Sequence, residues 1–187
     1  MLMVKVRSES MHNLIKNLPP VRQSGLVWLW LTVIFYALDQ YTKYLAETYI
    51  QPGQPIEVMP FFNLVIRYNS GAAFSFLADA GGWQVYFFSI LTTLVSVGIL
   101  YYLAVTPKTN RWLSISLCLV LAGALGNLHD RVTLGYVIDF IDWYYDADNH
   151  WPAFNIADSV ILIGAVMLLL EGYVNKDEDE SQQKAHD

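Results

Sequence analysis

The chain has 187 residues, of which 55% are hydrophobic, 14% aromatic and only 15% charged, and its mean hydropathy is +0.33. These values are too apolar for an ordinary soluble domain of this length and indicate a membrane protein. The formal net charge of -6 comes largely from the acidic end of the chain and from "DFIDWYYDAD", which argues against a basic surface for nucleic acid. We therefore expect membrane lipids as partners and no nucleic acid.

Four apolar segments, at 26–45, 83–105, 112–129 and 154–174, are long enough to span a bilayer. The basic start of the chain precedes "LVWLWLTVIFYAL" without a small-x-small cleavage site, so the first segment is interpreted as a retained helix. Between the first two segments, Pro and Gly flank "FFNLVIRYN", a run suited to a short strand. The predicted fold is an all-α integral membrane protein with four transmembrane helices and a small external β-cradle between the first and second spans.

Three regions follow from this pattern. Residues 1–25 form a cytoplasmic N-terminal extension, 26–174 the four-span domain, and 175–187 an acidic, disordered cytoplasmic tail. The positive-inside rule supports this orientation, since three basic residues (Lys43, Arg67 and Arg131) fall on one side and eight on the other. The eight are Lys5, Arg7, Lys16, Arg22, Lys108, Arg111, Lys176 and Lys184. Both termini are expected in the cytoplasm and the long loops outside.

The only cysteine, Cys118, lies in an apolar segment, so the sequence offers neither a disulfide framework nor a cysteine-based metal site. The H-E-x-x-H motif of metalloproteases is absent, and "DADNHW" lacks the spacing and glycine of a calcium loop. We expect no metal and no cofactor.

Polar residues that a bilayer should exclude occur near the external ends of the spans. Asp39 and Lys43 are four residues apart, so they could pair on one helix face or form an interfacial ion pair with a snorkelling lysine. Gly123, Asn127 and Arg131 share one helical stripe, which could pack against another helix or present donors at the water boundary. In the same segment His129 and Asp130 could pair as in a serine hydrolase, but no G-x-S-x-G accompanies them.

Two carboxylates lie in apolar surroundings. Asp158 sits a turn inside the last span, where it could act as a first-turn acid on the helix dipole or face a polar cavity. Asp139, in "VIDF", is also flanked by apolar residues. Two carboxylates in a dry site share a proton and split their apparent pKa values. This is the requirement of an aspartic protease, in which one carboxylate takes a proton from water and the other polarises the scissile carbonyl.

Five blocks in this order, "DQYTK", "NSGAAFSFL", "GALGNLHDR", "VIDF" and "FNIADS", resemble the signature blocks of lipoprotein signal peptidase, also called signal peptidase II. The resemblance covers about residues 26–174. It implies a monomeric, four-span aspartic endopeptidase of the bacterial inner membrane with its active site near the periplasmic face. Its substrates would be diacylglyceryl-modified prolipoproteins, cut before the lipidated cysteine.

The resemblance also assigns roles to residues. Asp139 and Asp158 match the catalytic pair, and Asp39 and Lys43 match a supporting polar pair. The positions that line the site or hold the dyad and substrate are Asn69, Gly123, Asn127, Arg131, Asn155 and Ala157. The small residues of "GAAF" would leave room for a lipidated peptide beside the spans.

Two other classes are weaker alternatives. In a transporter or channel subunit, Asp39, Asp139 and Asp158 would form a proton or cation relay, which predicts acids at staggered depths and a polar path to the cytoplasm. A non-catalytic membrane scaffold would leave the two acids in apolar settings unexplained.

Overall fold

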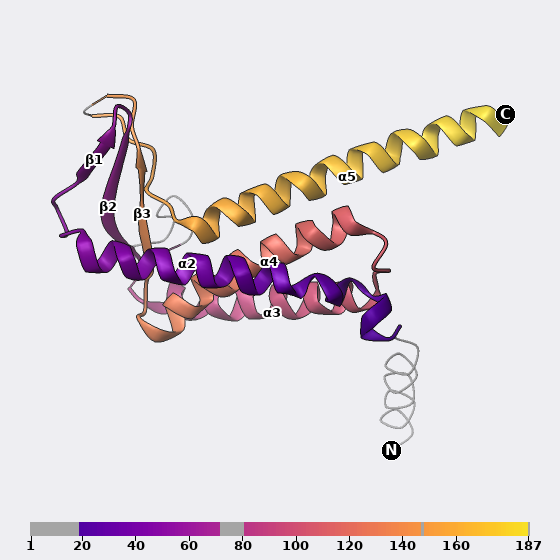
Figure 1. Ribbon diagram of the computed structural model, residues 1–187, viewed down its shortest axis with the longest axis horizontal. Helices are drawn as coiled ribbons and strands as arrows, with labels where there is room; N and C mark the ends of the chain where they lie inside the picture. Colours follow the sequence, from indigo (N-terminus) through magenta and orange to yellow (C-terminus); the bar gives the residue numbers. More distant parts are fainter. Residues whose placement is uncertain (1–18, 72–80, 147, 187) are drawn as a thin grey trace, which may run out of the picture.

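In the computed structural model, which describes residues 19–71, 81–146 and 148–186 and side chains as far as Tyr173, helices lie beside one another and a small sheet stands at one end (Figure 1). Two 3-10 turns, η1 (Val21–Gln23) and η2 (Gly25–Trp28), lead into the first long helix. The remaining elements are α2 (Leu29–Tyr49), β1 (Ile56–Met59), β2 (Phe62–Asn69), α3 (Trp83–Val105), α4 (Arg111–Thr133), β3 (Val137–Trp143) and α5 (Ile156–His186).

Three of the described helices are long and apolar enough to cross a membrane: Trp83–Val105, Arg111–Thr133 and the Ile156–Tyr173 part of α5. They correspond to the second, third and fourth predicted spans. Helix α2 has 21 residues, but Asp39, Gln40 and Lys43 lower the hydropathy of its second half. The first predicted span, on α2, therefore stays a prediction, and with it the count of four spans.

Helix α4 is the centre of the bundle, because α2, α3 and α5 all pack against it. In the most apolar stretch of α4, 61% of residues are buried, compared with 17% in the most apolar stretches of α3 and α5. The outer helices leave large apolar side chains such as Leu94 and Leu169 exposed, at 65% and 75%. In a chain with such apolar helices, this is the surface that lipid would cover.

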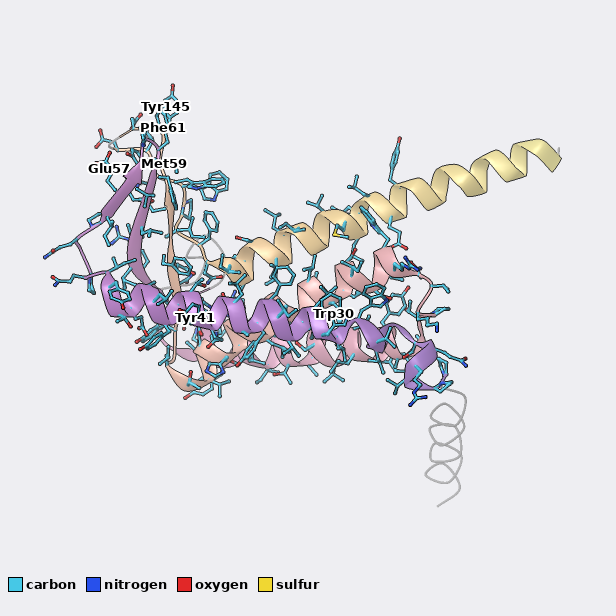
Figure 2. The ribbon with its side chains drawn as sticks, in the orientation of Figure 1. Trp30, Tyr41, Glu57, Met59, Phe61 and Tyr145 are labelled. Carbon is cyan, nitrogen blue, oxygen red and sulfur yellow. The ribbon has the colours of Figure 1, made fainter. Side chains whose placement is uncertain are left out.

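The outer face of α2 is also apolar. Trp30 and Tyr41, labelled in Figure 2, are 53% and 58% exposed, and Val33, Ile34 and Leu38 are exposed on the same helix. Its buried residues are Thr32, Asp39, Lys43 and Ala46. Asp39 and Lys43 thus face the protein and not its surroundings, whereas Glu47, near the end of α2, is exposed.

Two glycines of α4 allow the helices to approach closely. A Cβ atom on Gly123 would collide with the Ala157 carbonyl oxygen of α5, and one on Gly126 would lie 2.5 Å from Asp39 Oδ2 of α2. Ala157 itself is fully buried at this contact. Small residues here let the backbone of α5 approach α4 and leave room for the Asp39 side chain, and such small residues are common between membrane helices.

The sheet has the antiparallel order β1-β2-β3, with Phe62 opposite Trp143 and Arg67 opposite Asp139. The predicted strand at "FFNLVIRYN" is confirmed as β2. The sheet is not confined to the connection between the first two spans, however, because β3 comes from the connection between α4 and α5. The strand β3 is buried over most of its length. It therefore lacks the alternation of apolar and polar residues that identifies a half-buried strand.

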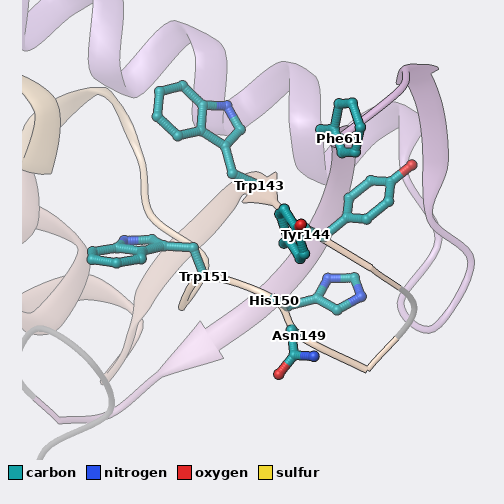
Figure 3. A pocket seen from close by; sticks show the side chains of 7 residues that line it. Phe61, Trp143, Tyr144, Asn149, His150 and Trp151 are labelled. Carbon is teal, nitrogen blue, oxygen red and sulfur yellow. The ribbon is translucent and has the colours of Figure 1, made fainter.

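An open aromatic pocket of about 570 Å³ lies at the end of the sheet away from the Arg67–Asp139 register (Figure 3). Its lining residues are Phe61, Trp143, Tyr144, Tyr145, Asn149, His150 and Trp151. Beside it, Asp142 is buried, accepts a hydrogen bond from Asn63 Nδ2 at 3.2 Å and has an oxygen 2.9 Å from His150 Nδ1.

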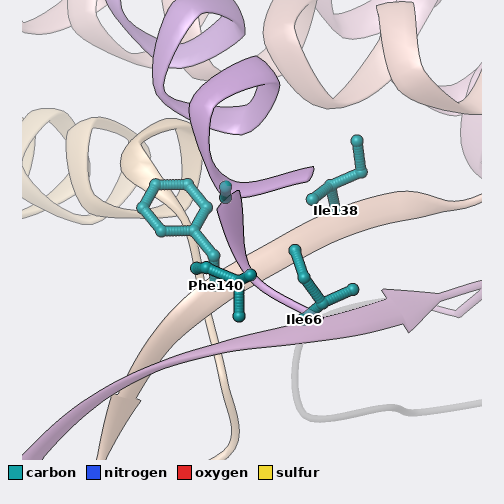
Figure 4. Close-up of a cluster of buried hydrophobic side chains, with 5 residues drawn as sticks. Ile66, Ile138 and Phe140 are labelled. Atoms are coloured by element: carbon teal, nitrogen blue, oxygen red, sulfur yellow. The ribbon is translucent and has the colours of Figure 1, made fainter. Parts of the chain in front are cut away.

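An apolar cluster fixes the sheet to the end of the helices (Figure 4). It joins Ala46 and Ile50, at the end of α2, to Ile66 of β2 and to Ile138 and Phe140 of β3. Complete burial of a large apolar side chain contributes about 1.5–3 kcal/mol. The cluster therefore holds β3, and with it Asp139, firmly against the helices.

Helix α5 extends to His186, into the segment 175–187 for which we expected a disordered tail. The segment contains Glu, Lys, Gln and Ala and neither Gly nor Pro, a composition compatible with a continued helix. Residues 72–77 of the "NSGAAFSFL" block and residues 1–18 of the N-terminal extension lie outside the described residues.

Candidate active site

Polar side chains from five elements, α2, β2, α4, β3 and α5, meet where the helix ends contact the sheet. Asp139 comes from the middle of β3, and Asp158 from the first turn of α5. Asp139 is only 3% exposed, while Asp158 is half-buried. The fold thus brings to one place two carboxylates that are nineteen positions apart in the chain.

The two oxygens of Asp139 have different partners. Oδ1 accepts a hydrogen bond from Asn155 Nδ2 at 2.8 Å, and Oδ2 accepts one from Asn69 Nδ2 at 3.1 Å. Asn69, at the end of β2, in turn accepts a hydrogen bond from the Gly71 backbone N–H at 3.0 Å. These contacts fix the carboxyl plane of Asp139.

Asp158 is held by an amide and by the backbone. Its Oδ1 accepts a hydrogen bond from Asn127 Nδ2 at 2.8 Å, and its Oδ2 accepts one from the Asn155 N–H at 3.2 Å. The Asp158 N–H donates to Asn155 Oδ1 at 2.9 Å, which completes a reciprocal cap at the start of α5. Asp158 is therefore a first-turn acid of α5, as one interpretation of the sequence proposed, and it also contacts Asn127, which that interpretation did not include.

Asn155 connects the two carboxylates. Its side-chain Nδ2 donates to Asp139 Oδ1 at 2.8 Å and also lies 3.2 Å from both Asn127 Oδ1 and the Ile138 carbonyl oxygen, which share its second N–H, while its backbone N–H donates to Asp158. It is completely buried. One residue thus orients both acids.

Burial raises the pKa of Asp139 from 3.8 to about 7, and the negative charge of Asp158 contributes in the same direction. The hydrogen bond from Asn69, the charge of Lys43 and the hydrogen bond from Asn155 act against this rise. Near neutral pH the Asp139 carboxyl can therefore keep its proton, as a general acid requires.

Lys43 lies behind the carboxylate pair. Its Nζ is 2.9 Å from Asp39 Oδ2, the contact that the four-residue spacing predicts, and 2.7 Å from Asp130 Oδ2. Lys43 also donates to Asn127 Oδ1 at 3.1 Å. The position of Lys43 inside the protein rules out the snorkelling interpretation, since Lys43 is only 2% exposed.

Two further polar residues, Asp130 and Gln40, belong to this site although no sequence pattern marked them as site residues. Gln40 Nε2 lies 3.0 Å from Asp130 Oδ1 and 3.2 Å from Asp39 Oδ2. The sequence spacing could have identified Asp130, because Asp130 follows Asn127 by three residues and the two therefore share one helix face. The serine-hydrolase alternative does not fit these contacts, since His129 is exposed and its Nδ1 lies 2.8 Å from Tyr36 Oη.

Arg131 crosses from α4 to the other elements around the site. It donates to the Asn127 carbonyl at 3.2 Å and to the Gly71 carbonyl at 2.8 Å, and its guanidinium lies 5.6 Å from the centre of the Phe88 ring. Its buried Nε has no hydrogen-bond partner within the described residues. Arg131 therefore links α3, α4 and the segment after β2.

The aromatic pocket at the sheet tip has no residue in common with this cluster. Within the described ranges, no group of three or more His, Cys, Asp or Glu side chains is placed to hold a metal ion. The carboxylate pair is the arrangement with a clear chemical use.

The apolar helices and the enclosed acids define an integral membrane protein with a polar site at one end of its helices. The profile of the family described as Signal peptidase (SPase) II matches residues 31–174. The chain belongs to this family and is therefore a peptidase, a class different from both the transporter and the scaffold alternatives.

Similar proteins agree with this assignment. A lipoprotein signal peptidase of Acinetobacter baumannii (strain ATCC 17978) is 51% identical over 80% of this chain and 84% of the relative. One from Alteromonas mediterranea is 45% identical over 88% and 90%. A bacterial membrane enzyme structure solved by the in meso method at 2.3 Å is 33% identical, covers 80% of this chain and 88% of its own, and has a TM-score of 0.71.

Proposed function

We propose that this protein is an aspartic endopeptidase that removes the signal peptide from diacylglyceryl-modified prolipoproteins by cleaving before the lipidated cysteine. The curated relatives are lipoprotein signal peptidases, which supports prolipoproteins as the substrates. The observation that carries the aspartic mechanism is the pair of carboxylates formed by buried Asp139 and half-buried Asp158, both hydrogen-bonded to Asn155.

The environments of the two acids suggest separate roles. Asp139, with its pKa raised to about 7, holds the proton and donates a hydrogen bond to the scissile carbonyl oxygen. Ionised Asp158 takes a proton from water as the water oxygen attacks the carbonyl carbon. The tetrahedral intermediate then breaks its C–N bond, and the proton on Asp158 passes to the departing amine of the cysteine. The signal peptide leaves with a new carboxylate.

The remaining site residues hold this pair in position. Asn69, Asn127 and Asn155 donate hydrogen bonds to the carboxylates, while Gly123 and Ala157 permit the helix approach that places α5 beside α4. Arg131 links the site to the carbonyl of Gly71, the first residue of the "GAAF" segment expected to leave room for the substrate. Asp39 and Lys43 form the supporting polar pair.

The location of the acids suggests how a bond is selected. Asp158 lies at the start of an apolar span, so a scissile bond held at the bilayer surface by two acyl chains and an apolar signal helix would lie at the same depth. We propose four spans in the bacterial inner membrane: the three apolar helices and, before them in the chain, α2, whose exposed face is also apolar. The site would face the periplasm and both termini the cytoplasm. We also propose that the enzyme is a monomer.

The orientation can be tested with a cysteine substituted for exposed Gln54, which lies between α2 and β1. In spheroplasts of bacteria expressing this variant, we expect an impermeant thiol reagent to label it without permeabilisation. The native protein is the control, because Cys118 is completely buried. Labelling of the Gln54→Cys variant only after permeabilisation would show that the orientation in the membrane is the reverse of the one proposed.

Purified protein in detergent is expected to convert a diacylglyceryl-modified prolipoprotein to a smaller product on a gel. The mechanism requires a protonated Asp139, and the pKa of this carboxyl is about 7. We therefore expect kcat/KM to be high below pH 7 and to fall as the pH rises through this value. The measurement is the rate of product formation from pH 5 to 9, with folding checked at each pH. Absence of product from a folded sample would contradict the proposed function, and a rate that rises steadily through pH 9 would contradict the role of Asp139.

A further inference from the structure

A buried triad of charged residues lies directly behind the carboxylate pair. Lys43 Nζ contacts Asp39 Oδ2 at 2.9 Å, Asp130 Oδ2 at 2.7 Å and Asn127 Oδ1 at 3.1 Å. The three charged residues are each no more than 2% exposed. An ammonium group has three N–H donors, so every donor of Lys43 has an acceptor.

Each carboxylate of the triad also accepts a hydrogen bond from the backbone next to a dyad aspartate. Asp39 Oδ1 accepts from the Ala157 N–H at 2.8 Å, and Ala157 is the residue immediately before the α5 aspartate. Asp130 Oδ2 accepts from the Ile138 N–H at 3.3 Å, and Ile138 is the residue immediately before the β3 aspartate. The two contacts are equivalent in kind, and Lys43 lies between them.

Gln40 closes the triad on a second side. Its Nε2 lies within 3.2 Å of Asp39 Oδ2, within 3.0 Å of Asp130 Oδ1 and within 3.2 Å of the Gly126 carbonyl. With this contact, both carboxylates of the triad are held by Lys43 and by Gln40. Buried charges that are so fully paired have little freedom to move, because any displacement leaves a charge unpaired in a dry environment.

We propose that Asp130 is a positioning residue of the peptidase. The Asp39–Lys43–Asp130 triad would set the separation of the two dyad carboxylates, because it binds the backbone N–H of the residue that precedes each of them in the chain. This inference rests on the proposed function. Asp130 has no contact with the reacting atoms; it acts through the Ile138 N–H and through Lys43. Its loss should therefore let the β3 segment shift relative to α5.

The test compares Asp130→Ala and Asp130→Asn with Asp142→Asn in the cleavage assay. Asp142 is a matched control, since it is a buried carboxylate on β3 whose partners, Asn63 and His150, lie toward the other end of the strand. Misplacement of reacting groups by about 1 Å can reduce a rate about a hundredfold. We expect Asp130→Ala to lower kcat by about this factor with KM unchanged, because substrate binding does not involve Asp130.

Asp130→Asn should lose less activity than Asp130→Ala, because the amide oxygen can still accept the Ile138 N–H. Asp142→Asn should keep kcat close to wild type. Thermal unfolding identifies the folded fraction, so all rates refer to folded protein; if Asp130→Ala does not fold, Asp130→Asn decides. A kcat of folded Asp130 variants equal to that of Asp142→Asn would overturn the inference, as would a loss confined to KM. An inactive wild type or an active Asp139→Asn variant would overturn the proposed function first, and the inference with it.

Discussion

Asp139→Asn and Asp158→Asn are each expected to abolish cleavage while the protein stays folded and inserted. An amide has nearly the volume of the carboxyl group and can still accept a hydrogen bond, so Asn155 and Asn127 keep a partner. It cannot exchange a proton with water or with the leaving amine, however. General acid–base catalysis contributes on the order of a hundredfold to ten-thousandfold in rate, and losses in this range or larger are expected from either substitution.

The measurement is single-turnover cleavage of a diacylglyceryl-modified prolipoprotein, with thermal unfolding as the check on folding. Asp142→Asn again serves as the control for changing a buried carboxylate on β3. If either dyad variant, properly folded, retained more than a small fraction of wild-type turnover, the assignment of the pair would be wrong.

The second large effect is the dependence of cleavage on the lipid. A prolipoprotein with an unmodified cysteine should be cut at least about a hundredfold more slowly than the same protein carrying diacylglyceryl. Burial of acyl chains is favourable by about 0.8 kcal/mol for each methylene, but the bilayer or the detergent supplies most of this before the enzyme is met. The main contribution of the anchor is position, since it holds the scissile bond at the depth of Asp139 and Asp158.

The experiment uses the two substrates in the same detergent, at concentrations below KM, and compares kcat/KM. A third substrate, with a shorter acyl pair on the cysteine, should give an intermediate rate if the anchor sets the depth. Equal rates for modified and unmodified substrates would remove the lipid from the mechanism and leave an aspartic peptidase of another specificity.

Local patterns in the sequence were sufficient for part of this description. The bounds of α3 follow from an uninterrupted apolar segment, because a helix in lipid must satisfy its own backbone over about 20 residues. The contact between Asp39 and Lys43 follows from a spacing of four on a helix, and the same spacing places the Arg131 side chain against the Asn127 carbonyl. Such relations depend only on helix geometry and on residues within one turn of each other.

Only the tertiary structure decided which distant groups meet. The strand β3 pairs with β2 across the chain, and this pairing brings Asn69 to Asp139. The contacts of Lys43 with Asp130 and of Asn127 with Asp158 depend on how closely α2, α4 and α5 pack. That packing depends on the absence of side chains at a few glycines and on the apolar cluster under the sheet. A hydrogen bond is lost with a displacement of about 1 Å, so no pattern confined to one helix or strand could determine these contacts.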